Sequence, residues 1–175
     1  RPIPSAMAYS KYERELKSIL HGDEDYIRRK IKPYDTDTHF NFLKILKKPF
    51  IVIRAAGSLG VDLVAIRGDI SFPIEVKFST NKTVHFSNTQ RLKQQAQEML
   101  EECRRARMFP IYAHRLKAVR GEDPWRISTI DIDGLRGKNK TLNRIIPNVH
   151  TTKAGHIALK WDDGMPLNKF IDYLC

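Results

Sequence analysis

The sequence predicts an α/β protein with a central mixed five-stranded sheet flanked by helices. Short apolar runs follow one another between residues 50 and 78, and two more lie between residues 109 and 130. Segments with helical spacing of apolar residues, at 8–21 and 87–107, precede the first and the fourth of these runs. The order is helix, three strands, helix, two strands, which is typical of a mixed sheet with helices packed on it.

The first predicted helix covers residues 8–21, where Leu16 and Ile19 recur at helical spacing. Residues 23–49 are charged and rich in turn formers, so they are expected to form an insertion rather than part of the sheet. Within it we expect one short helix, capped by Asp37.

Three strands are predicted next, because the apolar runs are interrupted only by turn residues. Ala55–Gly60 is a turn of small residues, and Arg67–Asp69 is predicted to close a hairpin. Pro73 lacks an N–H donor, which suggests an edge strand or a bulge. The three predicted strands are residues 50–54, 61–66 and 70–78.

The second long helix is predicted to begin at a Ser or Asn cap near residue 87. Phe109, Ile111, Tyr112 and Trp125 are expected to lie in the core or in a dimer interface. The elements predicted after this helix are strands at 109–114 and 125–130, a basic turn at 137–140, a strand at 158–161 and a helix at 165–174. We therefore expect a core domain at 8–133 and a C-terminal extension, 134–175, packed on it.

The net charge points to a polyanionic partner. Lys and Arg number 31 against 20 Asp and Glu, which gives a formal charge of +11 and a pI near 9.8. Nucleic acid is the expected partner, because neutralising phosphates releases condensed counterions. The competing interpretation is a basic protein with no nucleic-acid role.

Other features bound the class and the compartment. The chain has no run of about 18 apolar residues, so no membrane span is expected. Residues 1–6 lack the apolar part of a signal peptide and are expected to be a cloning remnant before Met7. The two cysteines form no CxxC pair, which favours neither zinc nor disulfides. A cytoplasmic location is expected, with nucleoid association if the source is archaeal.

Asp62, Glu75 and Lys77 form the candidate catalytic set. Alternation along a strand places Glu75 and Lys77 on one face, and a hairpin would bring Asp62 close to Glu75. Two carboxylates and the backbone carbonyl of Val76 are the oxygen ligands that Mg²⁺ prefers, and Mn²⁺ could substitute. Lys77 would position the attacking water, stabilise developing charge, or act as a base. The spacing by itself is also typical of a turn aspartate beside a solvated Glu–Lys strand face.

Several segments together resemble the archaeal Holliday junction resolvases, a family of the PD-(D/E)xK nuclease superfamily. The similarity covers roughly residues 9–131, interrupted by the long insertion. The matching segments are Tyr12-Glu-Arg-Glu-Leu16, Val52-Ile-Arg-Ala-Ala-Gly-Ser58, Val61-Asp-Leu-Val-Ala65, Ile74-Glu-Val-Lys77, Val84-His-Phe-Ser-Asn-Thr-Gln90 and Trp125-Arg-Ile127.

The resemblance implies a restriction-endonuclease-like nuclease core, and a homodimer that cuts four-way DNA junctions in recombination and repair. It adds Glu13 to the metal ligands Asp62 and Glu75, although as a residue of a helix Glu13 also reads as a solvated partner of Lys17. No small-molecule cofactor is expected. The residues expected to contact DNA are Arg54, Ser58 and Gln90 from the resemblance, and Lys82, Arg91, Lys93, Arg104, Arg105 and Arg107 from their charge.

The long 23–49 segment and the extension depart from the family pattern. The alternatives are therefore another nuclease of the superfamily, acting on flaps, ends or a specific sequence, and a DNA-binding module without catalysis. Asp35-x-Asp37-x-His39 has the spacing of metal ligands, but helix capping explains it better. For His114 and Arg115 we weigh a phosphate contact against a solvated strand end.

Overall fold

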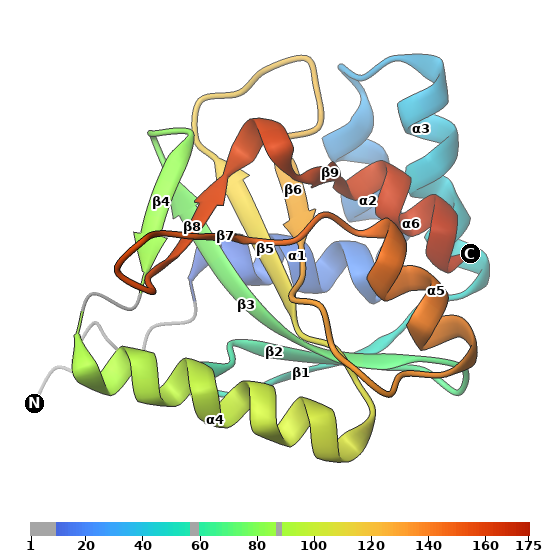
Figure 1. Cartoon of the computed structure of the whole chain (residues 1–175). Coiled ribbons are helices and arrows are strands. Elements are labelled where there is room, and N and C mark those ends of the chain that lie inside the picture. Colours follow the sequence, from blue (N-terminus) through green and yellow to red (C-terminus); the bar gives the residue numbers. More distant parts are fainter. Residues whose placement is uncertain (1–9, 57–59, 87–88) are drawn as a thin grey trace, which may run out of the picture.

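The computed structural model describes residues 10–56, 60–86 and 89–175, and within them the strands form two sheets (Figure 1). The main sheet has six strands in the order β1-β2-β3-β5-β6-β9. The small sheet has the order β4-β8-β7. The strands are β1 Ile51–Arg54, β2 Leu63–Ile66, β3 Ser71–Ser79, β4 Thr83–Phe86, β5 Ile111–Leu116, β6 Trp125–Ser128, β7 His150–Thr151, β8 Ile157–Lys160 and β9 Met165–Pro166.

The main sheet is mixed, as predicted. β1, β2 and β3 pair antiparallel, and the hairpin at Arg67–Asp69 is confirmed, because the Arg67 N–H donates to the Ile70 carbonyl across it at 3.1 Å. β3 and β5 pair in parallel, with Ile74 opposite Ile111. Parallel neighbours need a long crossover, and here β4 and α4 supply it.

Helices lie on both faces of the main sheet (Figure 1). α1 contacts β1, β2 and β3 from the face on which Phe72, Ile74 and Val76 are buried. α4 covers the opposite face, that of Glu75 and Lys77. The helices are α1 Lys11–Leu20, α2 Glu24–Ile31, α3 Thr36–Leu43, α4 Gln90–Ala106, α5 Gly137–Ile145 and α6 Leu167–Leu174, with 3₁₀ turns at Lys44–Lys47 and Trp161–Asp163.

The core brings together segments that are far apart in the sequence. The ring of Phe72 on β3 lies 5.4 Å from that of Phe50 and 5.6 Å from that of Phe170 on α6. The predicted core aromatics Phe109, Tyr112 and Trp125 are buried, each at most 2% exposed. Among the described residues, none of the helices is both long enough and apolar enough to cross a bilayer.

Several predictions about elements are wrong. The main sheet has six strands rather than five, because β9 from the C-terminal segment adds to β6. The insertion at 23–49 contains three helical segments instead of one, and Asp35 rather than Asp37 caps α3, by accepting a hydrogen bond from the Thr38 N–H at 2.9 Å. The predicted basic turn at 137–140 is the first turn of α5.

The cap of α4 and the position of Pro73 also differ. Thr89, not a Ser or Asn near residue 87, accepts from the Leu92 N–H at 3.2 Å. Pro73 lies in β3, which has neighbours on both sides, instead of at an edge. Its missing N–H is tolerated because β5 pairs with β3 only from Ile74 onward, and Ile74 is the residue that bonds toward β2.

Candidate active site

Asp62 directly precedes β2, at the point beyond which β3 is no longer paired with β2. The Asp62 N–H donates to the Ile74 carbonyl at 3.0 Å, and this is the last backbone hydrogen bond between the β2 segment and β3. Two residues further along β3, the partner is the Asp62 side chain instead of its backbone, and Asp62 Oδ2 accepts the Val76 N–H at 2.7 Å. The carboxylate is thus fixed beside the open part of β3 by the strand geometry.

The Val76 carbonyl shares that edge. In a strand, the N–H and C=O of one residue point to the same side, and the Val76 N–H points at Asp62. The Val76 carbonyl oxygen is therefore directed toward the same edge as the Asp62 carboxylate.

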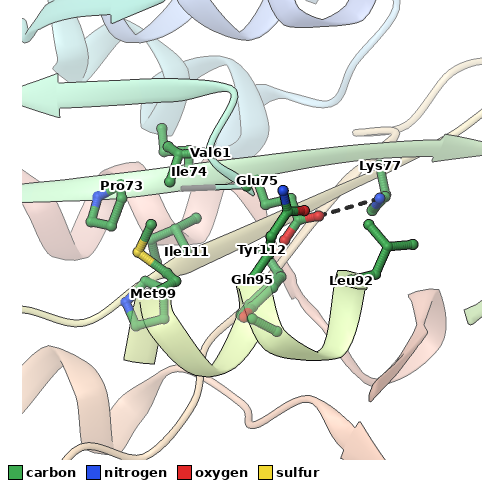
Figure 2. A pocket seen from close by; sticks show the side chains of 13 residues that line it. Val61, Pro73, Ile74, Glu75, Lys77, Leu92, Gln95, Met99, Ile111 and Tyr112 are labelled. Atoms are coloured by element: carbon green, nitrogen blue, oxygen red, sulfur yellow. Dashed lines mark ion pairs between the residues drawn. The ribbon is translucent and has the colours of Figure 1, made fainter. Parts of the chain in front are cut away.

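Glu75 and Lys77 lie on the same face of β3, as predicted. The Lys77 ammonium lies 3.2 Å from Glu75 Oε1, and both side chains are about one-quarter to one-third exposed. Tyr112 and His114 are their neighbours across the parallel pair with β5. The ion pair is drawn in Figure 2, above the helix α4.

Glu13 approaches Asp62 from α1, which packs on the other face of the sheet. The Asp62 carboxylate raises the pKa of Glu13, whereas Arg54 at the end of β1 lowers it. Glu13 is also the third residue of a helix whose cap is Ser10, and the Ser10 hydroxyl accepts the Glu13 N–H at 3.1 Å. A Ser at the cap with Glu three residues later is a capping box, so Glu13 has a helix-stabilising role of its own.

The three acids are held in an environment that disfavours their charge. Burial is the largest cause that raises the pKa of each of Glu13, Asp62 and Glu75. Like charge adds to it, because Asp62 raises the pKa of both other acids. Lys77 opposes this at Glu75, and the Val76 N–H opposes it at Asp62. A bound divalent cation would relieve this repulsion.

The acidic side chains supply oxygen donors for a divalent metal but do not form a preassembled site. Among the described residues, no three acidic, histidine or cysteine side chains are already grouped as a complete metal site. Asp62 is instead the shared member of two acidic pairs, one with Glu13 and one with Glu75. Carboxylate oxygens and a strand carbonyl match the donors that Mg²⁺ takes, with water filling the remaining positions.

Gln95 on α4 is a site residue that the sequence did not indicate. It lines a cavity of about 50 Å³ together with Glu75 and Lys77 (Figure 2). A cavity of this size can hold ordered water when several polar groups surround it. A Cβ added at Gly60 would lie 3.6 Å from Gln95 Cβ, so the loop before β2 also packs on this side chain. In the sequence, the one signal that Gln95 faces the sheet is its position three residues after Leu92, which lines the same cavity.

The residues expected to contact DNA do not all gather here. Arg54 acts electrostatically on both Glu13 and Asp62, so it belongs to the site. Gln90 and Lys93 line a separate open groove of about 760 Å³ between α4 and the small sheet. Lys82 pairs with Asp162 at 3.0 Å. Arg91 and Arg107 are exposed, Arg104 and Arg105 pair with Glu101 and Glu102 on α4, and Ser58 lies outside the described residues.

His114 and Arg115 match neither interpretation that the sequence left open. His114 is 2% exposed, its Nε2 lies 2.8 Å from Ser79 Oγ, and burial lowers its pKa to about 4. Arg115 turns inward to Glu15 of α1, with Nε 3.2 Å from both carboxylate oxygens. Glu15 also accepts the Trp125 indole N–H at 3.1 Å, so this acid is part of the core.

The comparisons with known proteins give a likeness of structure but none of sequence. No family model and no curated protein matches the sequence. A solved structure of an archaeal hyperthermophile protein, the Holliday junction resolvase Hjc of Archaeoglobus fulgidus, is similar with a TM-score of 0.46 and 17% identity. The likeness covers 70% of this chain and 82% of that one.

Proposed function

We propose that this protein is a metal-dependent, structure-selective DNA endonuclease that resolves four-way junctions in recombination and repair. The observation that carries the proposal is the acidic edge beside β2, where Asp62 adds to burial in raising the pKa of both Glu13 and Glu75, and where Lys77 lies 3.2 Å from Glu75. Burial and the Asp62 carboxylate both disfavour the charged forms of Glu13 and Glu75, which costs folding energy that a bound cation would offset. The resolvase-like motifs in the sequence support the choice of substrate.

Each residue of the edge has a role that its geometry supports. Glu13, Asp62, Glu75 and the Val76 carbonyl would hold Mg²⁺, or Mn²⁺ in its place. When bound, the metal would lower the pKa of a water and offset charge on the scissile phosphate. Lys77, 3.2 Å from Glu75, is placed to orient the attacking water or to stabilise charge on the phosphate oxygens.

Positive charge is available to bind the substrate. Arg54 lies beside Glu13 and Asp62 at the open edge, where it could contact the phosphate next to the cut. The net charge of +11 favours binding of a polyanion by counterion release. A homodimer would place two such edges around a junction with two-fold symmetry, so that equivalent strands are cut.

A cleavage assay on matched substrates tests the proposal. A fluorescently labelled four-way junction and a linear duplex with the same arm sequence are incubated separately with the protein and Mg²⁺. We expect paired cuts near the junction centre, little cutting of the duplex, and none with EDTA. Equal cutting of both would favour another nuclease of the superfamily. Binding without cutting in either Mg²⁺ or Mn²⁺ would favour a DNA-binding module.

A further inference from the structure

An exposed aromatic side chain follows the catalytic lysine directly. Phe78, the residue after Lys77 on β3, is 43% exposed. Because side chains alternate along a strand, Phe78 points to the face opposite Lys77, which is the face of α1. There its ring lies 4.9 Å from that of Tyr12, the residue before Glu13. The two rings therefore lie next in sequence to Glu13 on α1 and to Lys77 on β3, two of the elements that form the acidic edge.

Lysines surround these two rings. The Lys117 ammonium lies 5.1 Å from the centre of the Phe78 ring, and the Lys11 ammonium lies 5.3 Å from that of Tyr12. The Lys117 N–H donates to the Ser79 carbonyl at 2.8 Å, which ties the segment after β5 to the end of β3. We call Lys11, Tyr12, Phe78 and Lys117 the Phe78 platform.

The support beneath the platform is rigid. Arg115 lies under Tyr12, 4.7 Å from its ring, and is itself held by the buried Glu15. A partly exposed ring on a fixed base loses little conformational entropy when it stacks on a ligand. Aromatic rings flanked by cations are the features with which proteins bind unpaired nucleobases and their phosphates.

We propose that the Phe78 platform stacks an unpaired nucleobase of the DNA next to the scissile phosphate, while Lys11 and Lys117 contact the flanking phosphates. The inference rests on the proposed nuclease function and gives a physical origin for its selectivity. A base inside a continuous duplex is stacked on its neighbours and does not offer a free face. A base at a branch point or a single-stranded end does, so the platform favours branched DNA.

Binding measurements on two Phe78 variants test the proposal. Affinities of Phe78→Ala and Phe78→Leu for a four-way junction, a single strand and a matched duplex are measured by fluorescence anisotropy in EDTA, which prevents cutting. Stacking of one base predicts a loss of roughly 5- to 150-fold for the junction and single strand. We expect duplex affinity within about twofold of wild type. Phe78→Leu keeps apolar contact with Tyr12, so it controls for a folding defect.

Phe40 provides the matched control. It is 69% exposed on α3, so Phe40→Ala removes an exposed phenylalanine from another part of the molecule and should leave all three affinities unchanged. A 2-aminopurine at the branch point gives a direct signal. Its fluorescence should be quenched by wild type and Phe40→Ala, but not by Phe78→Ala. In Lys117→Gln, the slope of log affinity against log salt concentration should fall in magnitude by about 1, as expected for the loss of one phosphate contact.

The outcomes separate this inference from the proposed function. If Phe78→Ala binds all three DNAs like wild type, the platform is not a stacking site, whatever the protein cuts. If Phe78→Ala instead shifts the sedimentation of the free protein toward monomer, the surface is an interface between two copies, which overturns the inference as well. If the wild-type protein cuts no DNA but Phe78→Ala still binds the single strand more weakly than wild type does, the nuclease proposal fails and the Phe78 platform is supported as a stacking site.

Discussion

Two glutamates on the same helix, two residues apart, have opposite surroundings. Glu15 points into the core, where Arg115 and the Trp125 indole N–H satisfy its carboxylate. Glu13 points to the sheet edge, where the neighbouring side chain that acts on it most strongly is another acid, Asp62. A buried charge with complete partners is explained by folding alone, whereas an acid beside another acid is the arrangement that the proposed metal site would explain.

The difference divides the main sheet into two regions. Around Glu15, α1, β5 and β6 form a closed network that fixes α1 on the sheet. Around Asp62, the same helix meets strands whose hydrogen bonding stops at Ile74, which leaves β3 open toward the site. Both regions share α1, so the helix that Glu15 ties to β5 and β6 also carries Glu13.

The largest expected effect is on cutting by Asp62→Asn. Losing metal-assisted stabilisation worth several kcal/mol should slow single-turnover cleavage by about 10³-fold or more. The Asn carbonyl can still accept the Val76 N–H, and a neutral side chain avoids the burial cost, so the melting temperature without metal should stay or rise. Gel assays and thermal denaturation check both. A lower melting temperature matching the lost activity would mean that Asp62 is structural.

Glu15→Ala should give the reverse pattern. Removing one partner of a buried ion pair costs about 3–5 kcal/mol, because Arg115 and the Trp125 N–H are left unsatisfied. Urea denaturation should show that loss, while cleavage per folded molecule at low temperature should change little. Arg104→Ala, which breaks the exposed pair with Glu101, is the control and should cost under about 1 kcal/mol. If Glu15→Ala abolished cutting in fully folded protein, the distinction between the two glutamates would be lost.

Glu13 can be separated into its two roles by two substitutions. Glu13→Gln keeps the capping box with Ser10, since Gln is also suited to the third position, but it removes the negative charge. We expect Mn²⁺ affinity to fall by about 10- to 100-fold with stability preserved. Glu13→Ala should lose stability as well, by about 1 kcal/mol. Equal Mn²⁺ affinity in wild type and Glu13→Gln would remove Glu13 from the metal site.

Gln95 offers a smaller test with a neighbouring control. Gln95→Met keeps the volume of the side chain and removes its amide from the cavity shared with Glu75 and Lys77. The loss of about one hydrogen bond to ordered water predicts a roughly 3- to 10-fold slower cleavage at saturating DNA. Gln94→Met changes an exposed residue that bonds Glu98, and it should have no effect. Equal rates for the two variants would show that Gln95 only packs against the sheet.

The smallest expected effect is on the pH dependence of stability. The raised pKa values of Asp62 and Glu75 mean that the metal-free fold holds these protons more tightly than the unfolded chain. Their contribution therefore favours the fold at acidic pH and is lost as pH rises through the folded pKa. With EDTA, the stability of wild type relative to Asp62→Asn should decline as the pH rises above about 4, the ordinary pKa of Asp. A rise of the relative stability with pH would contradict the pKa direction of Asp62.

The hairpin and the relative placement of Asp62, Glu75 and Lys77 could be predicted from the sequence because both depend on local patterns. Alternation along residues 70–78 places Glu75 and Lys77 together, and the turn at Arg67–Asp69 sets the pairing that brings Asp62 opposite. The three helical segments of the insertion could not be separated, because their apolar faces are short and charges interrupt them.

Other features depend on tertiary contacts that leave little trace in the sequence. Nothing in Glu-Arg-Glu distinguishes Glu13 from Glu15, since the difference comes from Arg115, one hundred positions away. Phe78 ends a strand whose other apolar residues are buried, and only the packing of α1 shows that its ring is exposed. The strand that makes the main sheet six-stranded, β9, is two residues long, which is too short for any periodic signal.

The most direct test of the central claim is metal binding by the acidic edge. Isothermal titration calorimetry with Mn²⁺, without DNA and at pH 7.5, should show saturable binding by wild type and a loss of at least about tenfold in affinity in Asp62→Asn and Glu75→Gln. Glu101→Gln, an exposed acid on α4, should bind like wild type. Absence of Mn²⁺ binding to wild type, or equal binding by all four proteins, would contradict a metal centre at Glu13, Asp62 and Glu75.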